Sequence, residues 1–319
     1  MYHLLAPGSI VYWERATLVK GQKISYNEVD MTISVLYPTE WTDYECIDSG
    51  NGKKLERFGT YSINRPDPRI LWTPSLPKEH WDLTNATFIQ SDSLAGRWVI
   101  QNTAPNPWRI GYKNLTFELQ STNFKHVGIF PEQAVNWDWI IEKVNKRPLR
   151  ILNLFAYTGG ATLASASAGT MVTHVDSVKS VLAWAKKNTE LSHVASNGVR
   201  WICDDAYKFV LREGRRSSTY DAIIMDPPRF GRGSQGEVWK LHEDLPKLLH
   251  ACLAILSPNP QFFLINTYTA DISSIVLGHL LHNMFKDKGG VIESGELAIQ
   301  EAFGKRLIPH GIYARWSNV

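Results

Sequence analysis

A carboxylate followed by two prolines and an arginine, Asp226-Pro227-Pro228-Arg229, is the segment of this sequence that points most clearly to chemistry. It follows the apolar run 220–225, which is typical of a buried strand. Two consecutive prolines fix φ and restrict the residues before them, so they hold the nearby carbonyls in one direction. A carboxylate beside such a carbonyl can accept both hydrogens of a planar amine or hold the edge of a base. The alternative is a rigid turn that only ends the strand.

A second candidate segment is Phe155-Ala156-Tyr157-Thr158-Gly159-Gly160, which begins at the end of the apolar run 151–155. Glycines at such a place let the backbone pass close beneath a bound cofactor and let the next helix begin near it. An ordinary turn between a strand and a helix would use them as well. The segment lacks the G-x-G-x-x-G pattern, which counts against a dinucleotide and therefore against an NAD-dependent dehydrogenase.

Carboxylates also follow the next two predicted strands. Asp176 ends the run 171–176, where it can accept both hydroxyls of a ribose, and Ser177 can cap the helix that follows. Asp204-Asp205-Ala206 follow the run 199–203, and Asp205 could accept a hydrogen bond from an adenine amino group. Helix capping is the simpler role for both Asp176 and Asp205.

The elements that must position these residues alternate between strands and helices from about residue 150 onward. Such alternation predicts an α/β fold with a parallel, doubly wound sheet. Ligands of these sheets bind at the carboxyl ends of the strands, where the segments above are found. The predicted strands are 151–155, 171–176, 199–203, 220–225 and 261–266, with two more strand-like runs around Glu296 and Ile312. The predicted helices are 177–188, 206–212, 245–256 and 272–285, with a small-residue helix after Gly160.

Residues 1–120 differ in composition from the rest of the chain, because they are rich in turn residues and short β-like runs. They are predicted to form a smaller β-rich domain for substrate recognition. Residues 1–30 carry little pattern and are expected to be a loosely attached extension. The front domain contains a charged patch, 53–57 followed by 65–69, that could be a basic clamp or a solvated hairpin. The domain that carries the candidate site would then be 121–319.

Composition narrows the class only a little. The 319 residues carry a net charge of +3 with a pI near 8.6, which is compatible with nucleic acid without requiring it. Three distant cysteines, Cys46, Cys203 and Cys252, suggest neither a disulfide framework nor a zinc site, and no metal is expected. With no signal peptide or long apolar stretch, a cytoplasmic location away from membranes is expected. The oligomeric state stays open.

Taken in order along one sheet, these segments resemble the motifs of class I S-adenosylmethionine (SAM)-dependent methyltransferases, and most of all the bacterial large-subunit rRNA methyltransferases that modify cytosine or guanine. The resemblance implies a Rossmann-like, mostly parallel seven-stranded sheet whose last strand is antiparallel. It implies that Gly159 lies under the methionine part of SAM, Asp176 binds the ribose, Asp205 meets the adenine and Asp226 faces the methyl group. The candidate cofactor contacts are Phe155, Tyr157, Thr158, Gly159, Gly160, Asp176, Ser177, Asp204, Asp205 and Ala206.

That branch also carries a Lys-Thr-Gly…Asp-Gln-Arg segment before the first strand of the sheet. The corresponding residues here run from Lys125 to Ala134, with the lysine, glycine and glutamine kept and the final arginine replaced by Ala134. The resemblance implies a lid over the cofactor, with Lys125 and Gln133 as contacts.

The missing cysteine bears on the acceptor atom. Transfer to C5 of a pyrimidine needs a thiolate that attacks C6, and the resembling C5 enzymes carry a cysteine after the fifth strand or the proline pair. Here the fifth strand ends Asn266-Thr267-Tyr268-Thr269 without one. Nitrogen is therefore preferred, although the aromatic Phe230 stands one position later than in amino-methylating enzymes, which leaves the acceptor open.

The expected reaction is direct in-line displacement, in which the protein mainly aligns the reacting atoms. Asp226 and the Pro227 carbonyl would accept hydrogen bonds from the target nitrogen. Tyr157, Phe230 or Tyr268 could sandwich an extruded base, and Arg229 and Arg232 could hold phosphates or simply line a solvated loop.

Three function classes are compatible with these residues: an RNA methyltransferase, with rRNA as the substrate that the resemblance implies; a methyltransferase on a protein or small molecule; and a non-catalytic SAM- or RNA-binding module. Intact Asp176 and Asp226 speak against the last class. A front domain of more than 100 residues is larger than a small-molecule enzyme needs, which favours a macromolecular target.

Overall fold

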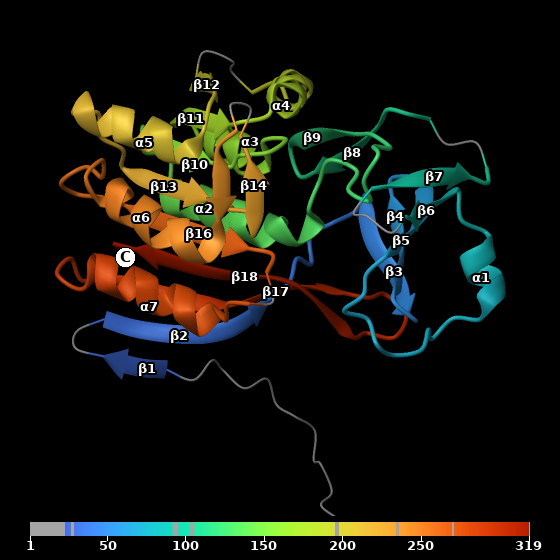
Figure 1. Ribbon diagram of the computed structural model, residues 1–319. Coiled ribbons are helices and arrows are strands. Elements are labelled where there is room, and N and C mark those ends of the chain that lie inside the picture. Colours follow the sequence, from blue (N-terminus) through green and yellow to red (C-terminus); the bar gives the residue numbers. More distant parts are fainter. Residues whose placement is uncertain are drawn as a thin grey trace, which may run out of the picture.

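The computed structural model describes residues 23–26, 29–91, 95–102, 105–194, 198–233, 236–269 and 271–318. Figure 1 shows a large layered α/β part and a smaller β-rich part beside it, joined by the long strands near the C-terminus. Its helices are α1 (Lys78–Asp82), the 3₁₀ helix η1 (Pro131–Gln133), α2 (Ala134–Val144), α3 (Gly160–Ser167), α4 (Lys179–Leu191), α5 (Ala206–Arg215), α6 (Leu241–Leu253) and α7 (Ser274–Phe285). Its strands are β1 (Lys23–Tyr26), β2 (Val29–Leu36), β3 (Tyr44–Gly50), β4 (Lys53–Phe58), β5 (Tyr61–Pro66), β6 (Ala86–Gln90), β7 (Gly96–Ile100), β8 (Trp108–Tyr112), β9 (Leu115–Leu119), β10 (Arg150–Leu154), β11 (Met171–Asp176), β12 (Val199–Cys203), β13 (Ala222–Met225), β14 (Phe230–Arg232), β15 (Val238–Lys240), β16 (Phe262–Thr267), β17 (Val291–Gln300) and β18 (Leu307–Ser317).

The central sheet contains the seven predicted strands in the order β17-β18-β16-β13-β10-β11-β12. The five strands from β16 to β12 are parallel to one another, and β18 is antiparallel to both of its neighbours, as expected. The number seven was too low, because β2 pairs in parallel with β17 and β1 pairs with β2, which makes nine strands. An apolar alternation in the second half of the chain could not have revealed these early strands.

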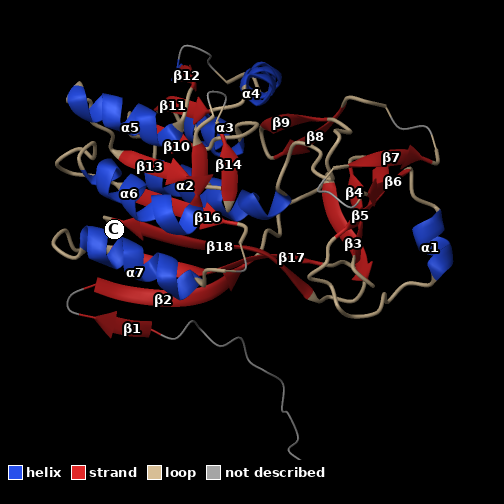
Figure 2. Cartoon of the chain, in the orientation of Figure 1, coloured by secondary structure: helices blue, strands red, loops and turns tan. Residues whose placement is uncertain are grey.

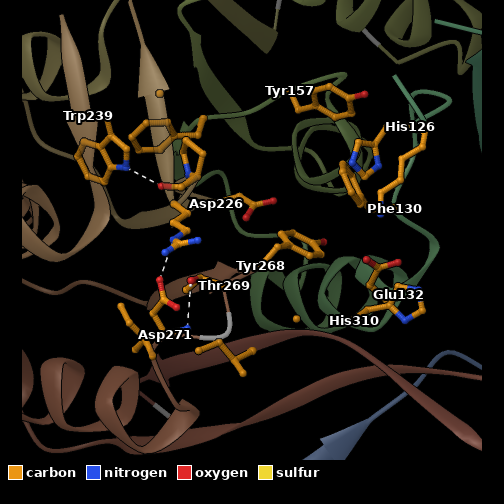
Figure 3. A pocket seen from close by; sticks show the side chains of 18 of the residues that line it. His126, Phe130, Glu132, Tyr157, Asp226, Trp239, Tyr268, Thr269, Asp271 and His310 are labelled. Atoms are coloured by element: carbon orange, nitrogen blue, oxygen red, sulfur yellow. Dashed lines mark hydrogen bonds and ion pairs between the residues drawn. The ribbon is translucent and has the colours of Figure 1, made fainter. Parts of the chain in front are cut away.

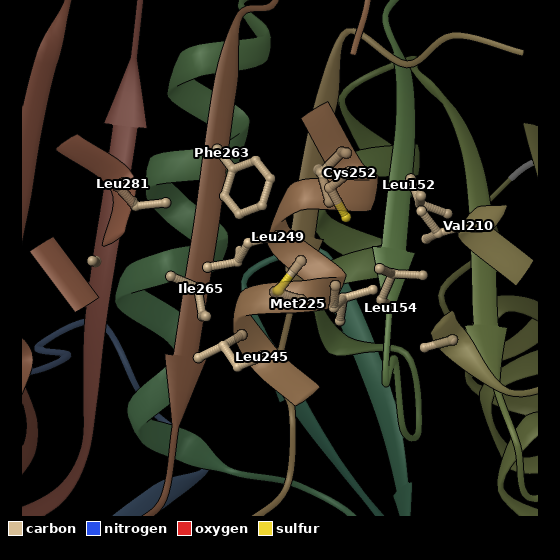
Figure 4. Packing of buried hydrophobic residues seen from close by; sticks show 14 of the residues in the cluster. Leu152, Leu154, Val210, Met225, Leu245, Leu249, Cys252, Phe263, Ile265 and Leu281 are labelled. Atoms are coloured by element: carbon tan, nitrogen blue, oxygen red, sulfur yellow. The ribbon is translucent and has the colours of Figure 1, made fainter. Parts of the chain in front are cut away.

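Helices cover both faces of the sheet, which is why its inner strands read as continuous apolar runs (Figure 2). Leu152 and Leu154 of β10 face a core that includes side chains of α5, α6 and α7, while Ile151 faces a second core with α2. Figure 4 shows the first of these cores, where Leu245 and Leu249 of α6 pack beside Met225 and Ile265. This packing fixes the carboxyl ends of β10, β11, β12 and β13 at one edge.

The front part contains the five-stranded sheet β3-β4-β5-β6-β7 and the hairpin β8-β9. Its β-rich character agrees with the sequence. Its core continues into the rest of the molecule, because Phe117 and Ile110 share one cluster with Trp137 of α2 and Leu163 of α3. The end of the β17–β18 hairpin also reaches it, where the Ser49 hydroxyl donates to Glu301 over 2.5 Å. The two parts therefore pack against each other through a shared core.

The expected boundary between the two domains, at residue 120, does not separate the strands of the two parts completely. Strand β2 lies in the central sheet, although its sequence belongs to the expected front domain. Of the expected extension, residues 1–22, 27 and 28 lie outside the described residues. Among the described residues, no helix is long and apolar enough to cross a membrane.

One local expectation needs correction, and two elements were not predicted. Val178, and not Ser177, is the N-cap of α4, and it makes no side-chain cap; the Asp176 carboxylate accepts the Val178 N–H over 2.9 Å instead. Helix α2, which packs beneath β10, was missed. The short hairpin β14–β15 after the proline pair was also missed, since its strands are too short to show a period.

The close approach of α2 and α3 depends on Gly160. A β-carbon at this position would lie 2.6 Å from Cζ2 of Trp137, whereas one at Gly214 of α5 would be 3.8 Å from its nearest neighbour, Ile255. We expect Gly160→Ala to lower the free energy of unfolding by about 1–3 kcal/mol, because the indole must move within a packed core. Gly214→Ala is the matched control and is expected to be neutral or slightly stabilising. Urea unfolding of both variants tests this, and equal midpoints would contradict it.

Candidate active site

A cavity of about 1510 Å³ lies at the carboxyl ends of the parallel strands (Figure 3). A smaller pocket of about 60 Å³ adjoins it and shares Phe155, Tyr157 and Asp226 with it. The large cavity is lined by thirteen of the predicted residues: Lys125, Phe155, Tyr157, Asp176, Ser177, Asp204, Asp205, Ala206, Asp226, Pro228, Arg229, Arg232 and Tyr268. Gln133, Thr158 and Gly160 line the smaller pocket. Gly159, Pro227 and Phe230 line neither of the two.

Three carbonyls of the Asp226–Arg229 turn are held by hydrogen bonds from other elements. The Thr267 hydroxyl donates to the Pro227 carbonyl over 3.0 Å, and the Trp239 indole donates to the Pro228 carbonyl over 2.6 Å. The Leu241 N–H donates to the Arg229 carbonyl over 3.0 Å. Pro227 is buried and its carbonyl already accepts from Thr267, so the expected hydrogen bond from the target nitrogen would have to use the second lone pair of this oxygen. The turn presents the Asp226 side chain to the cavity.

The Asp226 carboxyl points toward the centre of the cavity, between the turn and Tyr268 (Figure 3). Burial raises the pKa of Asp226 well above its ordinary value, and the charge of nearby Glu132 adds to this shift. A carboxyl of this kind binds a proton readily, so Asp226 is suited to accept hydrogen bonds or a proton from a donor in the cavity.

The two arginines of the following loop lie at the mouth of the cavity. The Arg229 guanidinium is exposed and pairs with Asp271 over 2.7 Å. Arg232 lies 5.9 Å from the centre of the Phe230 ring, which is itself 53% exposed. Arg229 therefore has an acidic partner that the acid-free loop sequence did not reveal, and Phe230 does not form a wall of the cavity.

The glycine segment after β10 is held in a strained conformation. Phe155 and Tyr157 have φ values of 54° and 48°, and Gly159 has a φ of 93°. Side chains other than glycine rarely adopt such values, and they cluster at functional sites. The Tyr157 N–H donates to Asp176 over 2.9 Å, and the Thr158 hydroxyl donates to the Gly128 carbonyl over 2.6 Å. These bonds keep the segment open beneath the cavity.

The acidic residues after β11 and β12 line the same side of the cavity. Both oxygens of Asp176 accept backbone N–H groups, from Tyr157 and Val178, and burial raises the pKa of Asp176. Asp205 caps α5 by accepting the Lys208 N–H over 2.8 Å. Each carboxylate oxygen has a second lone pair, so both side chains can cap and still accept from a ligand.

Aromatic rings form the opposite wall. The Phe130 ring lies 5.5 Å from Tyr157 and 5.0 Å from Tyr268. The Gln133 amide donates to the Tyr268 hydroxyl over 2.7 Å and fixes its ring. Phe130 was missed from the sequence, although the motif segment contained it. It takes the place expected for Phe230.

None of the three cysteines lines the cavity. Cys46 and Cys252 are buried in the two cores, and Cys203 ends β12 with its thiol directed at the Ser177 carbonyl over 3.8 Å. The site therefore lacks a thiolate to activate C5 of a pyrimidine.

Comparison with known proteins gives the family. Residues 87–277, more than half of the chain, match the family model described as S-adenosylmethionine-dependent methyltransferase. The chain belongs to this family. The SAM-dependent methyltransferase from Agrobacterium tumefaciens is 38% identical and superposes with a TM-score of 0.87, over 96% of this chain and 100% of that one. SMU.776, solved with SAH, shares the fold at 19% identity with a TM-score of 0.67, over 87% of this chain and 76% of that one.

Curated relatives match a shorter region of the methyltransferase. Ribosomal RNA large subunit methyltransferase K/L from Shewanella sp. (strain ANA-3) is 31% identical over 153 residues, which is 47% of this chain and 21% of that protein. The protein of that name from Magnetococcus marinus is 29% identical over 161 residues, 47% of this chain and 20% of that protein. The chain thus spans about a fifth of the length of these relatives.

The residues of the cavity fit the cofactor of the methyltransferase. Buried polar atoms without a hydrogen-bond partner among the described residues include Asn136 Oδ1, Asn266 Nδ2 and Glu132 Oε1. Asn136 and Asn266 line the small pocket, so they present an acceptor and a donor of the kind that an ammonium and a carboxylate need. Asp176 and Asp205 supply acceptors for hydroxyl and amino groups on the other side.

Glu132 is a site residue that sequence reasoning missed. It lies in η1, is 1% exposed and lines the large cavity beside Tyr268 and His310 (Figure 3). Its signal was an acid directly after the apolar residues Ile129-Phe130-Pro131, within the motif segment from which only Lys125 and Gln133 were chosen.

The charged patch of the front domain also lines the cavity. Strands β4 and β5 form a hairpin, as one of its two interpretations required, but Lys54 and Arg65 are 7% and 5% exposed and face the cleft. The solvated interpretation is therefore wrong for these two residues.

Asp176 offers a direct test of where the cofactor binds. We expect Asp176→Asn to weaken SAM binding about 10- to 100-fold, because it removes a charged acceptor and places a donor amide opposite two N–H groups. Asp43→Asn is the matched control, since Asp43 also accepts a backbone N–H, that of Gly111 over 2.8 Å, away from the cavity. Calorimetric titration with SAM measures both. Equal affinities for the two variants would place the cofactor elsewhere.

Proposed function

We propose that this methyltransferase transfers the methyl group of SAM to a nitrogen of a nucleobase in RNA, with rRNA as the preferred substrate class. The proposal rests on one observation about the cavity. The proline turn directs the Asp226 carboxyl into it, and no cysteine lines it. A carboxyl can accept from an N–H group, and C5 transfer would need a thiolate. The rRNA methyltransferase names of the curated relatives favour RNA as the acceptor.

SAM supplies a methyl group on a sulfonium, which is already activated for transfer. Asp176 would hold the ribose hydroxyls, Asp205 the adenine amino group, and the small pocket with Asn136 and Asn266 the methionine end. Tyr157 and Val178 border the same side of the cavity. The loop strain at Phe155 and Tyr157 is consistent with a backbone shaped for close approach to a ligand.

The acceptor base would leave its stack and enter the cavity beside Asp226. Tyr268, held by Gln133, and Phe130 would form the aromatic wall against which it stacks. Asp226 would accept from the target nitrogen and keep its lone pair directed at the reacting carbon. The front domain would supply substrate recognition, since its β4–β5 hairpin lines the cleft. A cytoplasmic location is part of this proposal.

Incubation with methyl-labelled SAM and RNA from a strain that lacks the enzyme tests the function. Nucleoside mass spectrometry should find the label in an N-methylated base of rRNA. Label in 5-methylcytidine would contradict the nitrogen acceptor while leaving RNA as the substrate. Label transferred only to protein or to small molecules, or to no acceptor although SAM binds, would overturn the proposal.

A further inference from the structure

The wall of the cavity that the front domain builds contains more basic than acidic groups. Glu56 is buried and accepts two hydrogen bonds from Arg65, over 2.8 and 2.7 Å, and one from the Tyr44 hydroxyl over 2.9 Å. Asp67 is buried and accepts from the Arg69 guanidinium over 2.8 and 2.7 Å. Each of these acids is thus neutralised by its own arginine in a bidentate pair.

Two lysines on the same wall, Lys54 and Lys125, are not part of these bidentate pairs. The Lys54 ammonium lies 3.5 Å from Glu56 and 3.7 Å from Asp67, and its nearest partner is Nε2 of His310 at 2.8 Å. That nitrogen must accept, because Nδ1 of His310 faces the Ile308 carbonyl at 3.0 Å and donates to it. His310 is therefore neutral, in line with a pKa held well below its ordinary value by burial and by Lys54.

Lys125 has still weaker compensation. Its ammonium donates to the Pro66 carbonyl over 3.1 Å and forms no ion pair within the described part of the chain. Burial and the charges of Lys54, Arg65 and Arg69 lower the pKa of Lys125 to about 8. Glu132 is a further acid of this cavity, and burial raises its pKa.

Lys54 is buried and Lys125 is half-buried. Cations removed from water are costly unless anions compensate them, so a negatively charged ligand would improve the charge balance of this wall. The cavity of about 1510 Å³ also exceeds the roughly 300–1,000 Å³ of a pocket for one drug-sized ligand. Lys54, Lys125 and Arg69 line it on the front-domain side, whereas Asp176 and Asp205 follow β11 and β12 of the central sheet.

We infer that Lys54 and Lys125 form an anion site that binds a phosphate group of the acceptor nucleotide while its base lies beside Asp226. The inference rests on the proposed function for the source of that phosphate, an RNA phosphodiester. Lys54 and Lys125 supply several N–H donors, and His310 and Pro66 orient them. The site gives the front domain a direct part in placing the substrate, and it assigns Lys125 to the substrate instead of the cofactor.

Protection of Lys125 from acylation measures the site without turnover. The full chain is treated with acetic anhydride near pH 8, with inorganic phosphate or with chloride at equal ionic strength, and peptides are quantified by mass spectrometry. Phosphate should slow acetylation of Lys125 several-fold and leave Lys113, outside the cavity, unchanged. Equal labelling of Lys125 in phosphate and chloride would overturn the anion site.

Kinetics of two matched variants then identify the ligand. Lys125→Met should raise KM for RNA about tenfold, with kcat and the SAM dissociation constant within twofold of native, and Lys125→Arg should recover most of the loss. Lys113→Met, the same charge change at a residue paired with Asp138, should alter none of these values. A tenfold loss of SAM affinity in Lys125→Met would assign the amine to the cofactor and contradict the inference.

The two proposals can fail separately. Phosphate protection of Lys125 together with methylation of free nucleoside 5′-monophosphates and not RNA would keep the anion site and overturn the RNA substrate. Methylation of RNA without phosphate protection would keep the proposed function and overturn the anion site.

Discussion

The hydrogen bonds to the carbonyls of the proline turn determine how this turn faces the cavity of the methyltransferase. Thr267, at the end of β16, and Trp239, in β15, hold the Pro227 and Pro228 carbonyls. The prolines themselves lack N–H groups and fix φ, so the turn has few ways to relax. What it can offer to the cavity is the carboxyl of Asp226. The strands around β13 and the aromatic wall are arranged about this one side chain.

The electrostatics of the cleft are consistent with that arrangement. Burial and Glu132 raise the pKa of Asp226, so its ability to accept a proton is lost as the pH falls through that raised value. The front-domain side of the cleft carries an excess of positive charge. Glu56 and Asp67 are already paired with Arg65 and Arg69, so the charges of Lys54 and Lys125 are added to those pairs. A ligand with a donor-bearing base and an anionic phosphate complements both sides.

The sequence predicted the parts of the fold that depend on local pattern. Strands β11 and β12 were predicted with their observed bounds. Strand β2 was missed, since its pairing with β17 joins residues more than 250 positions apart and no local pattern records it. The carboxylates at the ends of β11, β12 and β13 were found from their position alone.

The hydrogen-bonding state of site residues could not be predicted, because it depends on distant partners. The Pro227 carbonyl looked free in the sequence, but Thr267, forty positions later, donates to it. Arg229 looked unpaired, but Asp271 faces it across the mouth of the cavity. The sequence left two interpretations open for Lys54, a basic clamp or a solvated hairpin, and in the structure this lysine is buried beside His310. Glu132 was missed because only residues identical to the family's motif, Lys125 and Gln133, were taken as contacts.

The central claim is that the Asp226 side chain acts on the acceptor and not on the cofactor. The most direct test is the single-turnover rate of methyl transfer by Asp226→Ala, measured with its affinity for SAM. The account predicts a rate at least 100-fold below native, with the SAM dissociation constant within a few-fold. Asp221→Ala is the matched control, because Asp221 stands just before the same strand and accepts the Arg150 N–H over 2.9 Å at its other end; its rate should stay near native. A loss of SAM binding in Asp226→Ala as large as the loss of rate would contradict the claim.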